Sequence, residues 1–223
     1  MYEIDIHTHQ VKTEVSIRIL NIFAQDLPFL NDKSYYSAGL HPWHIGLSEP
    51  EECLKSIELA TGQKNMLAVG ECGLDRSVTG DFAMQEFYFR KQIEIAKKHS
   101  KPLIIHCVRA FPELMKIKKE TKSDIPWIIH DFHGNQQTAL QLMSHDFYFS
   151  VGNKLLSDQR KKDILKLLPA DRLFLETDDG NTSISGIYLL AAQMLNISHE
   201  TLIDIVLENF KHLFGFEKLP ILI

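Results

Sequence analysis

The chain has 223 residues, of which 44% are hydrophobic and 24% charged, values that are ordinary for one globular domain with a substantial core. Its net charge of −5 argues against a strongly basic nucleic-acid-binding surface. This charge does not exclude a nucleic-acid substrate, because bound divalent cations supply positive charge locally. Two short basic runs, Lys116–Lys119 and Arg160–Lys162, are expected to be solvated helix faces.

The three cysteines, Cys53, Cys72 and Cys107, have no paired spacing and form no C-x-x-C motif. We expect buried free thiols, as in a reducing cytoplasm. The first residues contain no basic segment followed by a long apolar one, and no stretch is long enough to span a bilayer. The sequence therefore predicts a cytoplasmic protein with no membrane association and no obligatory protein partner.

Strand-like runs alternate with helical stretches along most of the chain. Runs rich in β-branched and aromatic residues predict eight strands, at residues 2–7, 15–23, 35–40, 66–71, 102–106, 126–130, 147–151 and 172–177. Helical periodicity predicts helices at residues 50–61, 82–99, 110–121, 135–145, 157–168, 186–196 and 199–213. This alternation indicates a parallel α/β architecture. No repeat, linker or low-complexity segment divides the chain, so residues 1–223 are predicted to form a single domain.

The first third of the chain is irregular. Only Gln10–Glu14 separate the first two predicted strands, whereas a parallel crossover usually needs a dozen residues or more. Residues 24–34 also have the composition of a loop. We therefore predict a (β/α)8 TIM-type barrel that lacks its first one or two outer helices. The alternative makes residues 15–23 the first helix, since the apolar positions of this segment also fit a helical period.

Side chains that can bind a metal ion stand where five of the predicted strands end. They are His7, His9, Glu71, His106, His130 and Asp178. Residues two apart in a strand point the same way, so His7 and His9 can reach one ion. In a barrel of parallel strands the carboxyl ends gather at one mouth, where the chemistry is placed. The pattern predicts a metal-dependent hydrolase, against the alternative that the histidines are hydrogen-bonded core residues. Glu176 shares a face with Asp178 but lies deeper, so we expect it to hydrogen-bond a ligand histidine.

Four further side chains are candidates for substrate binding. His41 and His44, in the loop after the third strand, could bind a substrate phosphate or support a metal ligand. Arg76 and Arg109 follow the fourth and fifth strands and could neutralise a phosphate oxygen. For each arginine, a surface salt bridge is an equally good interpretation.

Six motifs in this order resemble those of the TatD-like deoxyribonucleases, which are metal-dependent hydrolases of the amidohydrolase superfamily. The motifs are Asp5–His9, Gly39–His44, Ala68–Asp75, Ile104–Cys107, Ile129–Gly134 and Leu175–Asp178. Together they span nearly the whole chain. The resemblance implies a (β/α)-barrel phosphodiesterase that acts on DNA or on a small phosphodiester.

The resemblance also implies a divalent metal site of one or two ions. Its ligands would be His7, His9, Glu71, His106, His130 and Asp178. Glu71 could bridge two ions, and a pair of ions about 3.5–4 Å apart can hold both the attacking and the leaving oxygen of a phosphoester. Asp178 would hold an ion and accept the proton of the attacking water. Mixed imidazole and carboxylate ligation suits Mg2+, Mn2+ or Zn2+.

Three segments depart from the family's pattern. Asp178 is followed by Asp179–Ser183, without the family's arginine-rich loop, and the segments after His106 and His130 also differ. With few cationic side chains expected at the mouth, we predict exonuclease-like, single-stranded or end-directed cleavage of DNA. The alternatives are a superfamily enzyme that cleaves a small-molecule amide or lactone, and a non-catalytic scaffold. A glutamate at the fourth strand favours the nuclease, because a modified lysine is common in the amide and lactone hydrolases.

Overall fold

The computed structural model describes residues 2–10, 16–29 and 34–216. The chain divides into two compact units, which we describe separately. The terminal unit comprises Met1–Leu20 and His130–Ile223, and the central unit comprises Asn21–Ile129. Among the described helices, none has both the length and the apolar character needed to cross a membrane.

Eight strands follow one another in the order of the chain. They are β1 (Glu3–Thr8), β2 (Ser16–Phe23), β3 (Tyr35–Gly39), β4 (Met66–Asp75), β5 (Leu103–Val108), β6 (Trp127–Ile129), β7 (Phe147–Val151) and β8 (Leu173–Leu175). The described strand pairings are parallel. With helices between the later strands, this is the (β/α)8 TIM-type fold, so the predicted fold class is confirmed. Residues 16–23 form a strand and not the alternative helix.

Eight α-helices and four short 3-10 helices accompany the strands in the described residues. The α-helices are α1 (Pro50–Ala60), α2 (Phe82–Lys98), α3 (Phe111–Thr121), α4 (Gln136–Met143), α5 (Asn153–Leu156), α6 (Lys162–Leu167), α7 (Ile184–Leu195) and α8 (His199–Phe214). The 3-10 helices are η1 (Ala24–Phe29), η2 (Pro42–His44), η3 (Gln159–Lys161) and η4 (Ala170–Arg172).

Two sequence predictions need correction. The single helix expected over residues 157–168 is divided into η3 and α6, and α5 precedes it. The reason is Asp158, whose Oδ1 accepts a hydrogen bond from the Arg160 amide at 3.1 Å and so competes with a regular helix start. The loop expected over residues 24–34 begins with η1, while residues 30–33 lie outside the described part. In the described residues between β1 and β3 there is no α-helix, in agreement with the predicted loss of outer helices.

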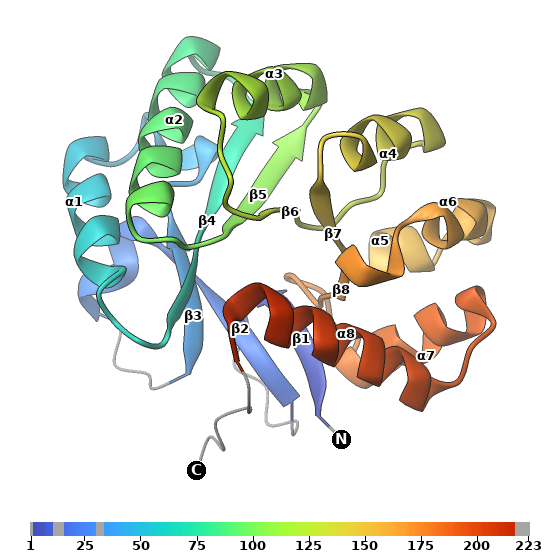
Figure 1. Cartoon of the computed structure of the whole chain (residues 1–223). Helices are drawn as coiled ribbons and strands as arrows, with labels where there is room; N and C mark the ends of the chain where they lie inside the picture. The colour runs from blue at the N-terminus through green and yellow to red at the C-terminus, as the bar shows by residue number, and fades with distance from the viewer. Residues whose placement is uncertain (1, 11–15, 30–33, 217–223) are drawn as a thin grey trace. The chain divides into compact units, whose positions relative to one another are not determined.

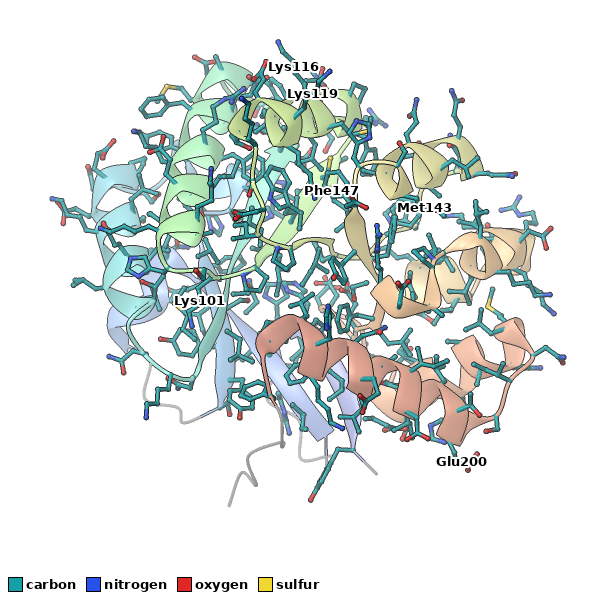
Figure 2. All side chains as sticks on the ribbon, viewed as in Figure 1. Lys101, Lys116, Lys119, Met143, Phe147 and Glu200 are labelled. Carbon is teal, nitrogen blue, oxygen red and sulfur yellow. The ribbon has the colours of Figure 1, made fainter. Side chains whose placement is uncertain are left out.

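In the central unit, helices lie along the outside of the strands. Figure 1 shows α1 and α2 side by side near β3 and β4. Helix α2 begins at the cap Asp81, whose Oδ1 accepts from the Ala83 amide at 2.8 Å, and it buries Phe89 and Ile93. The lysines of α3 behave as the sequence predicts, since Lys116 and Lys119 point away from the protein (Figure 2) and are exposed.

In the terminal unit, α7 and α8 pack against β1 and β8 (Figure 1). The Tyr188 hydroxyl of α7 accepts from the Ile4 amide at 2.9 Å and donates to the Ile4 carbonyl at 3.1 Å. The Asn209 amide of α8 donates to the Leu173 carbonyl at 2.9 Å. These buried side chains attach the helices to the strands at positions that precede the candidate ligands, so the carboxyl ends of β1 and β8 are left for chemistry.

Candidate metal centre

The end of β1 places two histidines beside one carboxylate in the terminal unit. The Nε2 atoms of His7 and His9 lie 3.6 Å and 3.5 Å from Asp178 Oδ1. The two rings reach the same carboxylate because residues two apart on a strand face the same side. His7 is completely buried, whereas His9 and Asp178 are partly accessible. One ligand atom from each of the three lies within 4.8 Å of the others, so together they could hold a cation.

The main chain fixes the spacing of this group. The Asp178 amide donates to the His7 carbonyl at 3.0 Å, and the His9 amide donates to the Asp178 carbonyl at 3.1 Å. Asp178 has a φ of 52°, in the left-handed region that aspartate enters more readily than most residues. The carboxylate is therefore positioned by the strand pairing next to both imidazoles.

A third histidine of the terminal unit comes from the end of β6. The ring of His130 lies 4.5 Å from that of His7, and its Nδ1 is 3.3 Å from Glu176 Oε1. Glu176 is fully buried and also accepts from the Asp131 amide at 2.8 Å. A proton on Nδ1 places the His130 lone pair on Nε2, the arrangement that a metal ligand needs. The prediction that Glu176 hydrogen-bonds a candidate ligand is confirmed.

Another buried carboxylate supports the same end of β8. Asp5 accepts from the Thr177 amide at 3.0 Å and from the Thr177 hydroxyl at 2.7 Å. Burial raises the pKa of Asp5 to about 6, although the Thr177 hydrogen bonds oppose that rise. Asp5 therefore holds the residue that precedes Asp178.

The central unit contains a second group of one carboxylate and two histidines. Glu71 Oε1 lies 3.1 Å from His41 Nε2 and 3.0 Å from His106 Nδ1. The Glu71 amide donates to Asn21 Oδ1 at 2.8 Å, which fixes the main chain at this position. Ligand atoms of His41, Glu71 and His106 all lie within 4.8 Å of one another.

Asp75 extends this group to the other side of the His106 ring. Its Oδ2 lies 3.0 Å from His106 Nε2 and accepts from Trp43 Nε1 at 2.7 Å. Burial raises the pKa of Asp75, but hydrogen bonds from His106, Ser77 and Trp43 outweigh it and hold this pKa well below the ordinary value. Sequence analysis gave Asp75 no role. The available signal was its position four residues after Glu71, on the same face of one strand.

The two other candidate histidines occupy different surroundings. His41 is buried beside Glu71, and its Nδ1 accepts from the Trp43 amide at 3.2 Å, so the proton on Nε2 can be donated to Glu71. Burial lowers the pKa of His41, and Glu71 opposes that shift. His44 instead lines a pocket of about 360 Å³ with residues of η1 and α1, and its Nδ1 accepts from Gln25 Nε2 at 3.1 Å.

The two arginine candidates have different surroundings. Arg76 Nη2 lies 2.6 Å from Glu113 Oε1, and its guanidinium lies 3.9 Å from the centre of the Phe82 ring. For Arg76 the structure thus shows the salt-bridge alternative. Arg109 is exposed directly after β5, with a φ of 52°.

Lys154 is a cation that sequence analysis missed. Its Nζ lies 2.6 Å from Asp131 Oδ2 and 3.7 Å from Asp178 Oδ2, within the terminal unit. Burial opposes charging, but Asp131 and Asp178 together raise the pKa of Lys154, so the ammonium stays protonated. The residue went unnoticed because no element was assigned to residues 152–156, where α5 begins after β7.

The donor atoms in both units suit a divalent metal ion. Each group combines imidazole nitrogen with carboxylate oxygen, a mixture that Zn2+, Mn2+ and related ions accept. Glu176 and Asp75 accept hydrogen bonds from the imidazoles of His130 and His106 and so hold these rings, as outer carboxylates do around ligand histidines. The residues present therefore fit a metal site.

Sequence comparison relates the chain to known hydrolases. Residues 4–215 match the family described as "TatD related DNase". An uncharacterized metal-dependent hydrolase of Bacillus subtilis, YabD, is 29% identical over 200 residues, which cover 82% of this chain and 78% of that protein. The "3'-5' ssDNA/RNA exonuclease TatD" of Cronobacter sakazakii is 30% identical over 148 residues, which cover 64% of this chain and 56% of the exonuclease.

Solved structures share the fold. The TatD homologue YjjV of Escherichia coli superposes with a TM-score of 0.82 at 22% sequence identity, and the match covers 98% of each chain. A TatD family hydrolase of Entamoeba histolytica gives a TM-score of 0.78 at 16% identity, over 97% of this chain and 99% of that one.

Proposed function

The chain belongs to the TatD-related DNase family of metal-dependent hydrolases, and from this premise we propose that it removes nucleotides from an end of single-stranded nucleic acid. The observation that carries the proposal is the pairing of histidines with a carboxylate at strand ends in each unit. The relative from Cronobacter sakazakii is named as a 3'-5' exonuclease of single-stranded DNA and RNA. That name supports a single-stranded substrate and removal of nucleotides from the 3' end. We extend the substrate class predicted from sequence, DNA, to include RNA on the same ground.

We propose that the residues predicted as ligands bind divalent metal ions. They are His7, His9, His130 and Asp178 of the terminal unit and Glu71 and His106 of the central unit. Imidazole nitrogens and carboxylate oxygens are ligand atoms that divalent cations accept, and these six residues supply both kinds. We propose Mg2+, Mn2+ or Zn2+, as one or two ions.

A divalent cation at these ligands would acidify an attacking water and neutralise phosphate charge. The chain's own residues do the rest. Asp178 accepts the water proton, because it is the partly accessible carboxylate of its group. Glu71 lies between His41 and His106, and Asp75 orients the His106 ring. His44, Arg109 and Lys154 are available for substrate phosphates.

Two further proposals concern the class of enzyme and its location in the cell. The position of Glu71 on β4 favours a nuclease over an enzyme that cleaves a small-molecule amide or lactone. The three cysteines are free thiols, two of them buried, which supports a cytoplasmic location.

Removal of metal tests the function directly. Chelation should abolish hydrolysis of a 3'-labelled single-stranded oligonucleotide, and excess divalent cation should restore it. The matched duplex should be cut more slowly, because a rigid duplex enters the site less readily and metal ions must neutralise most of its phosphates. Full activity without metal, or preferred internal cutting of a long duplex, would contradict the proposal.

A further inference from the structure

Trp43 is a large aromatic side chain that is half exposed next to the histidines of the central unit. It lies in η2, is 53% exposed, and its ring centre is 4.8 Å from that of His41 and 5.7 Å from that of His106. The other tryptophan, Trp127, is completely buried. An exposed indole beside the candidate ligands needs an explanation, because burying its apolar surface would stabilise the fold.

The exposed ring is held in one orientation. Nε1, the only polar atom of the side chain, donates to buried Asp75 at 2.7 Å, and Asp75 in turn accepts from the Ser77 amide at 2.7 Å. On the main-chain side, Pro42 begins η2 and the Trp43 amide donates to His41 Nδ1 at 3.2 Å. The N–H of the indole already donates to a buried partner, so hydration of this group does not explain why the ring is exposed.

A rigid aromatic face that is fixed before ligand arrives loses little conformational entropy on binding. Base stacking on such a face tolerates any sequence, because every base has an aromatic surface. Resting on the function proposed above, we propose that Trp43 binds the substrate by stacking on one of its nucleobases, beside His41 and His106. Its ligand class is thus an unstacked base, which single strands and strand ends present and an intact duplex does not.

The competing role is structural, with Trp43 acting only to hold Asp75. Two variants separate these roles. Trp43→Phe keeps an aromatic face but removes the N–H that Asp75 accepts, and Trp43→Ala removes both. Phe87→Ala is the matched control, because Phe87 is an aromatic residue of the same unit, on α2, and is 46% exposed.

Binding can be measured without catalysis. In the metal-loaded protein, dTMP should quench the fluorescence of exposed Trp43, whereas 2-deoxyribose 5-phosphate, which has no base, should not. In Trp43→Phe the remaining signal of Trp127 should be insensitive to both compounds. Equal quenching by the two compounds, or no quenching by dTMP at millimolar concentration, would overturn the stacking role.

Kinetic measurements then test whether the effect of a Trp43 substitution depends on the nucleobase of the substrate. On single-stranded oligothymidylate, Trp43→Ala should lower kcat/KM by roughly ten- to a hundredfold, as expected for the loss of one stacked base. On the same strand ending in abasic residues the variant should approach the wild type, and Trp43→Phe should retain most activity on both. Equal losses on both substrates, or a loss in Trp43→Phe as large as in Trp43→Ala, would show the structural role. If the wild type with metal cleaves neither strand, the proposed function fails, while the dTMP quenching still decides the role of Trp43.

Discussion

Two carboxylates of the terminal unit, Asp5 and Asp178, have different roles although they lie close together. Asp178 is partly accessible and faces His7 and His9, so it is placed for chemistry. Asp5 is buried and satisfied by Thr177, so it supports the strand end. Hydrogen-bond partners and accessibility, rather than residue type, distinguish the two roles.

Asp5 should make stability depend on pH. Its folded pKa of about 6 lies above the ordinary 3.8, so the folded state binds more protons between these values. The free energy of unfolding should therefore fall as pH rises from about 4 to 6, by about 3 kcal/mol at most. Asp5→Asn cannot titrate and should lack this fall. Urea unfolding of metal-free protein at pH 4 and pH 7 measures it, and parallel pH profiles for variant and wild type would contradict the assignment.

Lys154 should bind a phosphate of the substrate. Lys154→Ala should raise KM more than it lowers kcat, because a phosphate contact is present in both ground and transition states. The slope of log affinity against log salt should decrease by about 0.7 for a single strand. Lys166→Ala, an exposed lysine of α6, is the control and should leave both quantities unchanged. A fall in kcat with KM and the salt slope unaltered would contradict phosphate binding.

Sequence and structure agree at the residue scale where chemistry depends on strand ends. His7, His9 and Asp178 come together, as do Glu71 and His106, because parallel strands align their carboxyl ends. Asp75 and Lys154 could not be found in the same way. The two-residue period places Asp75 on the same strand face as Glu71 but does not show that it meets His106 of the neighbouring strand. The position of Lys154 depends on where α5 begins, which local periodicity does not indicate.

Among the elements, β4 is shaped by close contact with β5. Gly73 has a φ of 141°, and a Cβ at this position would overlap the carbonyl oxygen of His106. The neighbouring strand can therefore approach only because the side chain is absent. The contact places the main chain of His106 between Glu71 and Asp75, the two carboxylates that its ring meets.

Gly73→Ala should destabilise the protein and displace His106. We expect a loss of roughly 3 kcal/mol or more in the free energy of unfolding, from backbone strain and the overlap together. Gly80→Ala is a matched control, because Gly80 has a similar φ of 147° but no atom within 4 Å of the place that a Cβ would occupy. Denaturant unfolding of the two variants separates the backbone strain from the overlap with β5. Equal losses in the free energy of unfolding would show that the contact with β5 is unimportant.

Element boundaries were predictable where a period or a cap marks them. Seven of the predicted strand and helix positions in the second half of the chain need only small shifts, and α2 ends within one residue of its expected limit. The segment around Asp158 was not predictable from apolar period, because a side-chain hydrogen bond decides its course. η1 was missed for a related reason, since a six-residue 3-10 helix is too short to show a period.

At the scale of the whole molecule, we propose that the two compact units fold as one domain. The chain leaves the terminal unit within β2 and returns to it after β6, so neither unit can be detached as a continuous C-terminal or N-terminal half. The single domain predicted from sequence, residues 1–223, stays a prediction.

Cooperative unfolding tests that proposal. Both tryptophans belong to the central unit, so their fluorescence reports on that unit, whereas far-UV circular dichroism reports on helices of both units. In urea the two signals of the metal-free protein should change with one midpoint and one slope. Separate midpoints would show that the units unfold independently.

The main-chain hydrogen bonds that join His7, His9 and Asp178 have a consequence for the rate of metal loading. Because these hydrogen bonds fix the spacing of the ligands, capture of a cation should be limited by how quickly the cation sheds its water and not by a rearrangement of the protein. Mg2+, which dehydrates reluctantly, should then load more slowly than Mn2+ at equal concentration. The rate of metal binding would then be set by the dehydration of the ion, because the strand pairing already holds the ligands at the required spacing.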